Sequence, residues 1–250
     1  MILMVDLNST LTNYLSVRHE HKCTQLKPFQ IKIVRPEDMH KNWIVSPATM
    51  NAHLKSQREM TEKPKLSTRF EQALVYATQL HANQVRKGSD IPYVSHLLSV
   101  AALVLEDGGD EDEAIAALLH DAVEDSGNTT IREEILVEFG ERVASIVDAC
   151  TESCTIPKPP WRDRKLRYIE QMRHACPSVL RVSMADKLHN ARSILADRDR
   201  EGEAVWDKFK GGKAGTLWFY RSLLEIYRKT GSNFLVSEIE RIVDRLESLQ

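Results

Sequence analysis

From Thr68 onward, apolar residues recur every three or four positions, which is the spacing of amphipathic helices. The stripes, in chain order, are Phe70, Leu74, Ala77 and His81; Leu97, Ala101, Val104 and Leu105; Ile131, Ile135 and Phe139; and Val143, Ile146 and Val147. Asp90 before Pro92 predicts a helix start with proline in the first turn. Residues 113–123 are rich in alanine and leucine, so we expect this helix to be buried on most sides.

The rest of the chain continues this pattern. Three prolines between residues 154 and 161 predict a loop, and further helices are expected over 162–174, 177–196, 217–227 and 237–249. The fold class is therefore all-α, a bundle of roughly eight to ten helices. Residues 1–65 differ: Phe29, Ile31 and Ile33 alternate with polar residues, which favours one short strand. We interpret 1–65 as a partly ordered extension or linker and 66–250 as the functional domain.

Composition narrows the class of protein. Hydrophobic residues make up 42%, charged residues 28%, and the formal net charge is -2, which is a soluble globular balance without a basic field for nucleic acid. No apolar run approaches the roughly 20 residues of a membrane span. The apolar start is cut by Asp6 and lacks a basic region, so it is a poor signal peptide. The four cysteines form no CxxC pair, which favours reduced thiols and a cytoplasmic protein.

One short stretch carries four groups able to bind metal or move protons. His120-Asp121 is followed three residues later by Glu124-Asp125, where a helical pattern gives way to Ser126. Groups at a helix end can converge on one point, and free carboxylates beside a bound cation suit hydrolysis by activated water. The alternative is a solvated acidic helix terminus.

His96 and Asp186 are the residues that could join this pair. His96 lies early in its predicted helix, and Asp186 shares a helical face with Val179 and Val182. A carboxylate that faces a core is costly unless it is paired or metal-bound. The alternatives are a core histidine and a buried ion pair. A set of two histidines and two aspartates suits Mn, Fe, Zn, Co or Ni better than calcium.

A phosphorylated substrate would need basic groups near such a metal. Arg86-Lys87 in the loop before the His96 helix is the first candidate, with solvated charge as its alternative. Two further basic clusters are less specific: Trp161 to Lys165, and Phe209 to Lys213. The GxxxxGK[ST] phosphate loop is absent from the sequence.

Taken together, these motifs resemble the H…HD…D signature of HD-domain metal-dependent phosphohydrolases, and most closely the hydrolase domain of RelA/SpoT enzymes and their stand-alone homologues. The resemblance covers about half of the chain, from Arg69 to Leu195. The matching segments are His81-Ala82-Asn83-Gln84, Arg86-Lys87, Ile91 to His96, Ala117 to Asp121, Glu124-Asp125, Thr129-Thr130-Ile131, Phe139-Gly140, Val147 to Thr151 and Ala185 to Asn190. Family loops commonly read Arg-Lys-Ser/Thr-Gly-Glu-Pro-Tyr, whereas this chain has Gly88-Ser89-Asp90-Ile91 after Arg86-Lys87.

The resemblance implies a manganese-dependent (p)ppGpp 3′-pyrophosphohydrolase, with other divalent transition metals as alternatives. By position in the family motifs, it implies metal ligands at His96, His120, Asp121 and Asp186, catalytic groups at Glu124 and Asp125, and substrate contacts at Arg86, Lys87 and Asn190. The expected partner is (p)ppGpp or a related phosphorylated nucleotide, with no nucleic acid and no membrane.

Two other functions fit the same sequence. Animal homologues in this family also act on NADPH, so a nucleotide phosphatase acting on NADPH or a nucleoside monophosphate is one alternative. A nucleotide-sensing HD module without turnover is the other. No synthetase-like segment follows the hydrolase motifs, so we expect a stand-alone protein rather than a bifunctional one.

Overall fold

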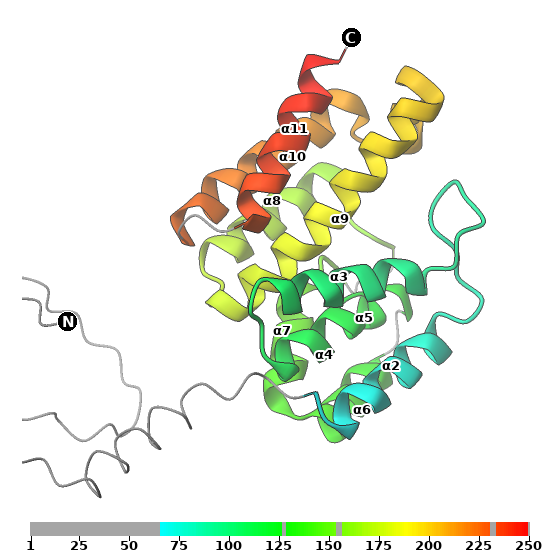
Figure 1. Cartoon of the computed structure of the whole chain (residues 1–250), viewed down its shortest axis with the longest axis vertical. Coiled ribbons are helices and arrows are strands. Elements are labelled where there is room, and N and C mark those ends of the chain that lie inside the picture. Colours follow the sequence, from blue (N-terminus) through cyan, green and yellow to red (C-terminus); the bar gives the residue numbers. More distant parts are fainter. Residues whose placement is uncertain (1–65, 127–128, 154–156, 231–233, 250) are drawn as a thin grey trace, which may run out of the picture. The chain divides into compact units, whose positions relative to one another are not determined.

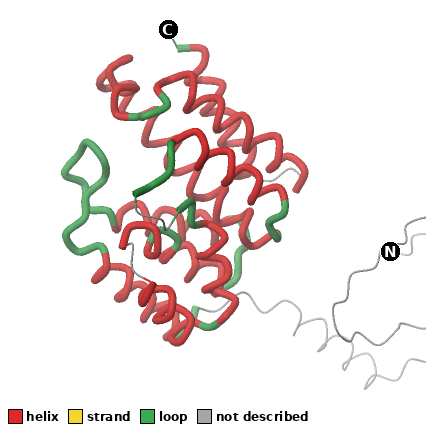
Figure 2. The backbone as a smooth tube through the Cα atoms, turned by 180° about the vertical axis from the view of Figure 1, so that it is seen from behind, coloured by secondary structure: helices red, strands yellow, loops and turns green. Residues whose placement is uncertain are grey.

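The computed structural model describes residues 66–126, 129–153, 157–230 and 234–249. The predicted strand at 29–33 and the extension that contains it lie outside these residues. Within the described residues the fold is all-α, as predicted, and the strand-like pairing there is a single isolated bridge between Val85 and Pro92 (Figures 1 and 2). None of the helices in this part of the chain is long and apolar enough to cross a membrane.

The helices follow one another with short connections. They are α2 (Thr68–Leu80), α3 (Val94–Glu106), α4 (Glu111–Leu119), α5 (Ala122–Ser126), α6 (Thr129–Phe139), α7 (Glu141–Cys150), α8 (Trp161–Arg173), α9 (Pro177–Glu201), α10 (Gly212–Tyr227) and α11 (Phe234–Ser248). Two 3₁₀ helices, Gly202–Lys208 and Arg228–Thr230, flank α10.

Helix α9 connects the two ends of the bundle. Its 25 residues pack against α3, α4 and α7 in one part and against α10 and α11 in another (Figure 1). Helix α4 lies in the core, and each of its residues from Glu113 to Leu119 is buried. The prediction that this helix is buried on most sides is therefore confirmed, and the contact of α4 with α9 lies beneath the site described below.

Several predicted boundaries were wrong: α9 continues to Glu201 instead of ending at 196, α10 begins at Gly212 instead of 217, α11 begins at Phe234 instead of 237, and two further shifts lie beside the site. The helix expected over 113–123 ends at Leu119, and α5 begins at Ala122, so His120 and Asp121 occupy a break. The helix expected to start near Asp90 begins instead at Val94. The reason is local pairing: the backbone N–H of Arg86 donates to Ile91 O at 2.8 Å and that of Tyr93 to Gln84 O at 2.9 Å. These bonds close a narrow loop that keeps the chain extended at Pro92.

A buried ionic cluster fixes the start of α4. Asp110 caps the helix by accepting a hydrogen bond from Glu113 N, and the Glu113 side chain accepts one from Asp110 N. Glu113 also accepts a hydrogen bond from Arg181 Nη1 at 2.6 Å, and Arg181 Nε reaches Asp107 at 3.0 Å. Glu113 is 3% exposed. One carboxylate therefore closes the capping box and binds α4 to α9.

Candidate active site

Four predicted ligands come together where α3, α9 and the α4–α5 break meet. One ligand atom each of His96, His120 and Asp186 lies within 4.8 Å of the others. Asp121 joins them, because its Oδ2 is 3.5 Å from His96 Nε2 and 3.2 Å from His120 Nε2. His96, His120 and Asp186 are buried, while Asp121 is half-buried. The break after α4 turns His120 and Asp121 toward the same point.

The histidine rings are oriented by bonds on their far sides. His120 Nδ1 lies 2.8 Å from Ala117 O, so it carries the proton and donates to this carbonyl. His120 Nε2 is buried and, although Asp121 Oδ2 lies 3.2 Å away, it makes no well-aligned hydrogen bond among the described residues, so a cation could take the place of its proton. His96 Nδ1 shares a 2.8 Å hydrogen bond with His189 Nδ1, which leaves His96 Nε2 facing Asp186 Oδ1 at 3.3 Å. Such outer bonds set the tautomer of metal-binding histidines.

Burial and charge act against each other in this cluster. Burial alone would lower the pKa of His120, but Asp121 and Asp186 raise it well above its ordinary value. Burial would raise the pKa of Asp121 and Asp186, but His120 for the first and Lys187 for the second hold each carboxyl pKa well below its usual range. Both carboxylates are therefore ionised at neutral pH, as ligation requires. Burial, and then His96, lowers the pKa of His189 to about 4, so it is neutral.

The arrangement fits a divalent metal ion. Two imidazole nitrogens and two ionised carboxylates form a mixed nitrogen and oxygen donor set, which is typical of divalent transition metals. The unpartnered Nε2 of His120 is an independent sign, since a buried polar atom without a partner is costly. These residues could hold the ion without rearrangement of the backbone.

Three side chains to which the motif analysis assigned no role orient three of the proposed ligands. Asp186 Oδ2 accepts a hydrogen bond from Lys187 Nζ at 2.5 Å, and Asp121 Oδ2 accepts one from Tyr93 Oη at 2.5 Å. His189 orients His96, as described above. The sequence could have indicated these three residues by their position, because each lies within a segment that also supplies a predicted ligand or substrate contact.

The predicted catalytic pair is only partly described. Glu124 Oε1 accepts a hydrogen bond from Lys158 Nζ at 2.9 Å, and Oε2 accepts one from Glu152 N at 3.1 Å. Its carboxylate is therefore bound to the segment after α7. The side chain of Asp125 lies outside the described part of the chain. The catalytic roles of both residues stay predictions.

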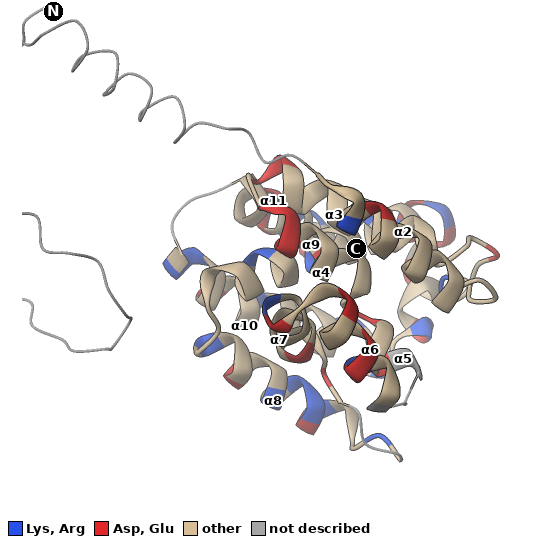
Figure 3. Cartoon of the chain, turned by 90° about the horizontal axis from the view of Figure 1, so that it is seen from below, with Lys and Arg blue, Asp and Glu red and all other residues tan. Residues whose placement is uncertain are grey.

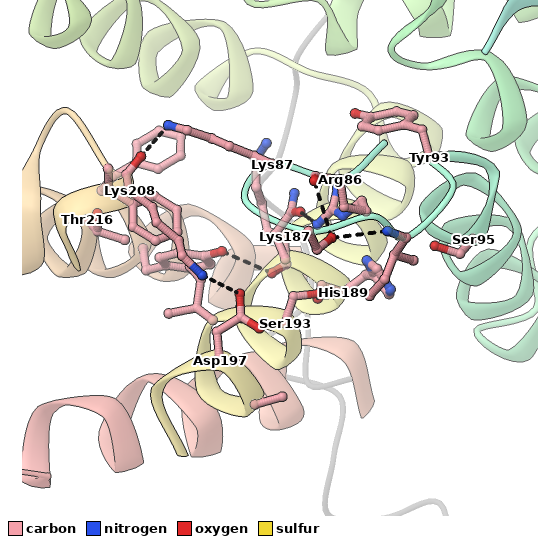
Figure 4. A pocket seen from close by; sticks show the side chains of 18 of the residues that line it. Arg86, Lys87, Tyr93, Ser95, Lys187, His189, Ser193, Asp197, Lys208 and Thr216 are labelled. Carbon is pink, nitrogen blue, oxygen red and sulfur yellow. Dashed lines mark hydrogen bonds and ion pairs between the residues drawn. The ribbon is translucent and has the colours of Figure 1, made fainter. Parts of the chain in front are cut away.

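A cavity of about 490 Å³ lies beside the cluster, with walls from the loop before α3, from α8 and α9, and from α10 (Figure 4). Its size is that of a ligand pocket. Tyr93, Lys187 and Asn190 belong both to this wall and to the surroundings of the cluster. The cavity's basic residues are Arg86, Lys87, Lys165, Lys187, Arg200 and Lys208, and its large aromatic ones are Tyr93, Trp161, Phe209, Phe219 and Tyr220.

The three predicted substrate residues lie in this cavity. Arg86 Nη2 donates to Asn190 Oδ1 at 2.7 Å, while Lys87 Nζ donates to Lys208 O and lies 5.8 Å from the centre of the Phe209 ring. Within the described residues, neither Arg86 nor Lys87 has a carboxylate at ion-pair distance. Their positive charges are therefore available to a phosphate group.

The two further basic clusters meet at the outer wall of this cavity. Helix α8 carries Trp161 at its start and a run of basic residues behind it (Figure 3). The Trp161 indole packs against the start of α10, where a Cβ added to Gly211 would stand 2.6 Å from the ring and one added to Gly215 would stand 3.0 Å from it. Gly211 and Gly215 thus make room for a tryptophan that lines the cavity.

Substitution of Gly211 by alanine tests this contact. Gly211 has an ordinary helical φ of -86°, so the expected cost comes from the collision with the indole and not from the backbone. We expect the free energy of unfolding to fall by about 1–3 kcal/mol, the usual range for overpacking, measured by urea denaturation. The control is the same substitution beside Trp161→Leu, in which the cost should shrink because the ring is gone. Equal costs in both backgrounds would contradict the contact.

Comparisons with known proteins agree with this geometry. Residues 73–217 match the family described as the HD domain, and the chain belongs to that family. Among its relatives, the guanosine-3′,5′-bis(diphosphate) 3′-pyrophosphohydrolase MESH1 of Xenopus tropicalis is 40% identical over 126 residues, which is 49% of this chain and 68% of the relative. The Homo sapiens protein of the same name is 36% identical over 126 residues, with the same coverage of both chains.

Two solved structures share the fold of this chain. One, described as a metazoan ortholog of SpoT that hydrolyzes ppGpp, has a TM-score of 0.59 and 25% identity, covering 74% of this chain and 99% of its own. Another, from Listeria monocytogenes EGD-e, has a TM-score of 0.54 and 32% identity, covering 60% of this chain and 97% of its own. The prediction of an HD-type phosphohydrolase that resembles the RelA/SpoT hydrolase domain is confirmed.

Proposed function

We propose that the protein is a metal-dependent (p)ppGpp 3′-pyrophosphohydrolase. The observation that carries this proposal is the His96, His120, Asp121 and Asp186 cluster beside a cavity rich in cations and aromatic rings. The relatives named above, whose printed activity is this reaction, support the same substrate.

The four clustered residues would hold the ion, for which Mn²⁺ is our proposal. A divalent ion bound there supplies Lewis acidity, which lowers the pKa of water toward neutrality and offsets phosphate charge. Lys187 and Tyr93 fix the orientation of the two carboxylates through their 2.5 Å bonds. A ligand set oriented in this way loses little entropy on binding, which favours affinity.

The cavity would place the nucleotide. Arg86 and Lys87 offer cations without carboxylate partners to the phosphate oxygens. Asn190 bonds both Arg86 and Asp186, and it thereby keeps the Arg86 guanidinium next to the metal-ligand cluster. The aromatic walls suit a base, because stacking needs a flat apolar face.

The residues would divide the proton transfers as follows. Glu124 takes the proton of the attacking water, after its carboxylate leaves Lys158. The new oxygen–phosphorus bond forms at the phosphorus attached to the ribose, and the bond from that phosphorus to the 3′ oxygen breaks. Asp125 delivers a proton to the departing 3′ oxygen. The products are GDP or GTP and pyrophosphate, so atoms balance with one water consumed.

An assay with identified products tests this function. Full-length protein stripped with a chelator is expected to be inactive, and Mn²⁺ should restore release of pyrophosphate from ppGpp. Arg86→Gln should raise KM about tenfold or more through the lost phosphate contact, with metal content unchanged. Arg167→Gln, on the exposed face of α8, is the matched control and should change neither. Release of orthophosphate from NADPH without pyrophosphate from ppGpp would contradict the proposal and favour the nucleotide phosphatase.

A further inference from the structure

Two lysines line the cavity but are not used as phosphate ligands in the reaction proposed above. Lys165 comes from α8 and Lys187 from α9, and their side chains are only 19% and 16% exposed. Lysine is rarely buried unless it is paired, because desolvation of the ammonium is costly. Two such groups in the wall of one cavity therefore call for a shared explanation.

Both ammonium groups lie beside the same aromatic ring. Lys165 Nζ is 4.4 Å and Lys187 Nζ 5.9 Å from the centre of the Phe219 ring, which itself lines the cavity. Lys187 Nζ is also 4.8 Å from the centre of the Tyr168 ring. Cation–π contacts of this kind hold the stems in place without neutralising the charge. The two charges are thus fixed near one another.

The carboxylates that face these lysines are shared with other donors. Glu152 pairs with Lys165 at 3.0 Å but also with Arg164 at 2.7 Å. Asp186 pairs with Lys187 at 2.5 Å, yet it also accepts from Asn190 and is a proposed metal ligand. Burial, and then the charge of Lys187, lowers the pKa of Lys165, although Glu152 acts against both. An anion in the cavity would offset the repulsion between the two lysines.

The lysine pair also stands at a defined place relative to the reacting phosphorus. Lys187 bonds the carboxylate that faces His96 and His120, so its ammonium is separated from the proposed metal cluster by Asp186 alone. A phosphate attacked at the cluster would have its next phosphate, one bridging oxygen away, on the cavity side.

We infer that Lys165 and Lys187 form a subsite for the distal phosphate of the 3′-diphosphate, and so favour substrates that carry a diphosphate over those that carry a single phosphate at the reacting position. This inference rests on the proposed function and assigns its substrate class to named residues. Both lysines act as phosphate ligands, and Lys187 also orients Asp186.

Binding of inorganic pyrophosphate tests the subsite without turnover. Radiolabelled pyrophosphate and, separately, orthophosphate are dialysed to equilibrium against the full chain at one buffered concentration of free Mn²⁺. Lys165→Met keeps the length of the stem and removes the charge. We expect it to weaken pyrophosphate binding about tenfold or more and to change orthophosphate binding less than about twofold. Lys229→Met, at an exposed position in the 3₁₀ helix Arg228–Thr230 and outside the cavity lining, is the matched control and should bind both anions as the parent does.

Two further variants separate binding from folding. Glu152→Gln removes a competing carboxylate, so pyrophosphate should bind as tightly as in the parent chain or more tightly. Lys165→Arg keeps the charge and should retain most of the affinity. Unchanged pyrophosphate affinity in Lys165→Met, or an equal loss for both anions, would overturn the inference. If Lys165-dependent pyrophosphate binding is found but ppGpp is not hydrolysed, the proposed function fails while the subsite stands.

Discussion

Asp121→Asn is expected to abolish hydrolysis with little change in fold. The amide keeps the shape of the side chain and its contact with Tyr93, but it removes a negative charge 3.2 Å from His120 Nε2 and 3.5 Å from His96 Nε2. Loss of one ligand charge should leave the ion weakly held. We expect kcat/KM for ppGpp to fall on the order of 10³-fold, about 4 kcal/mol of transition-state stabilisation.

The metal content of the purified variant shows whether the loss of activity comes from loss of the ion. It should fall well below one ion per chain, while circular dichroism stays that of the parent protein. Asp207→Asn, an exposed aspartate outside the cavity, is the matched control and should keep both metal and rate. A variant that loses activity but retains its full metal content would show that Asp121 is not a ligand.

Glu113→Ala is expected to give a large loss of stability. The substitution removes the capping-box acceptor of α4 and leaves Arg181 without the partner that it contacts at 2.6 Å. Breaking a buried ion pair from one side costs more than the pair contributes, and here Arg181 would keep Asp107 as its remaining partner. We expect the free energy of unfolding to fall by about 3 kcal/mol, read from the shift of the urea midpoint.

Glu106→Ala is the comparison, since that glutamate is exposed at the end of α3. Its effect should stay within about 0.5 kcal/mol. Because Glu113 bonds Asp110 and Arg181 and none of the four proposed ligands, residual folded Glu113→Ala protein should still bind metal. Equal stability of the two variants would mean that Asp107 alone satisfies Arg181.

The sequence predicted the class of fold well because helical periodicity depends on local spacing. The stripe from Phe70 to Ala77 lies in α2, and the one from Ile131 to Phe139 lies in α6. The predicted helix boundaries were wrong where tertiary contacts outweigh local helix propensity. The alanine- and leucine-rich run through Val123 has no local reason to stop at Leu119, yet the break there delivers His120 and Asp121 to the cluster.

The convergence of the four proposed ligands could be predicted because they lie in motifs, but their surroundings could not be. Nothing local indicates that Lys165 shares the Phe219 ring with Lys187, since these contacts join α8, α9 and α10. For the same reason, Trp161 and Gly211 were assigned to two separate basic clusters, because the contact between them forms only when α8 packs against α10. Sequence spacing reports a helix face, whereas partners across helices depend on the whole bundle.

Tyr93 has a consequence for how the site responds to its ligands. Its hydroxyl bonds the proposed metal ligand Asp121, while the Arg86 guanidinium lies 5.6 Å from the centre of its ring. A ring that turns to follow Arg86 also moves the hydroxyl that positions the carboxylate. Metal affinity and nucleotide affinity are then linked quantities: whatever factor the nucleotide adds to the affinity for the ion, the ion must add to the affinity for the nucleotide.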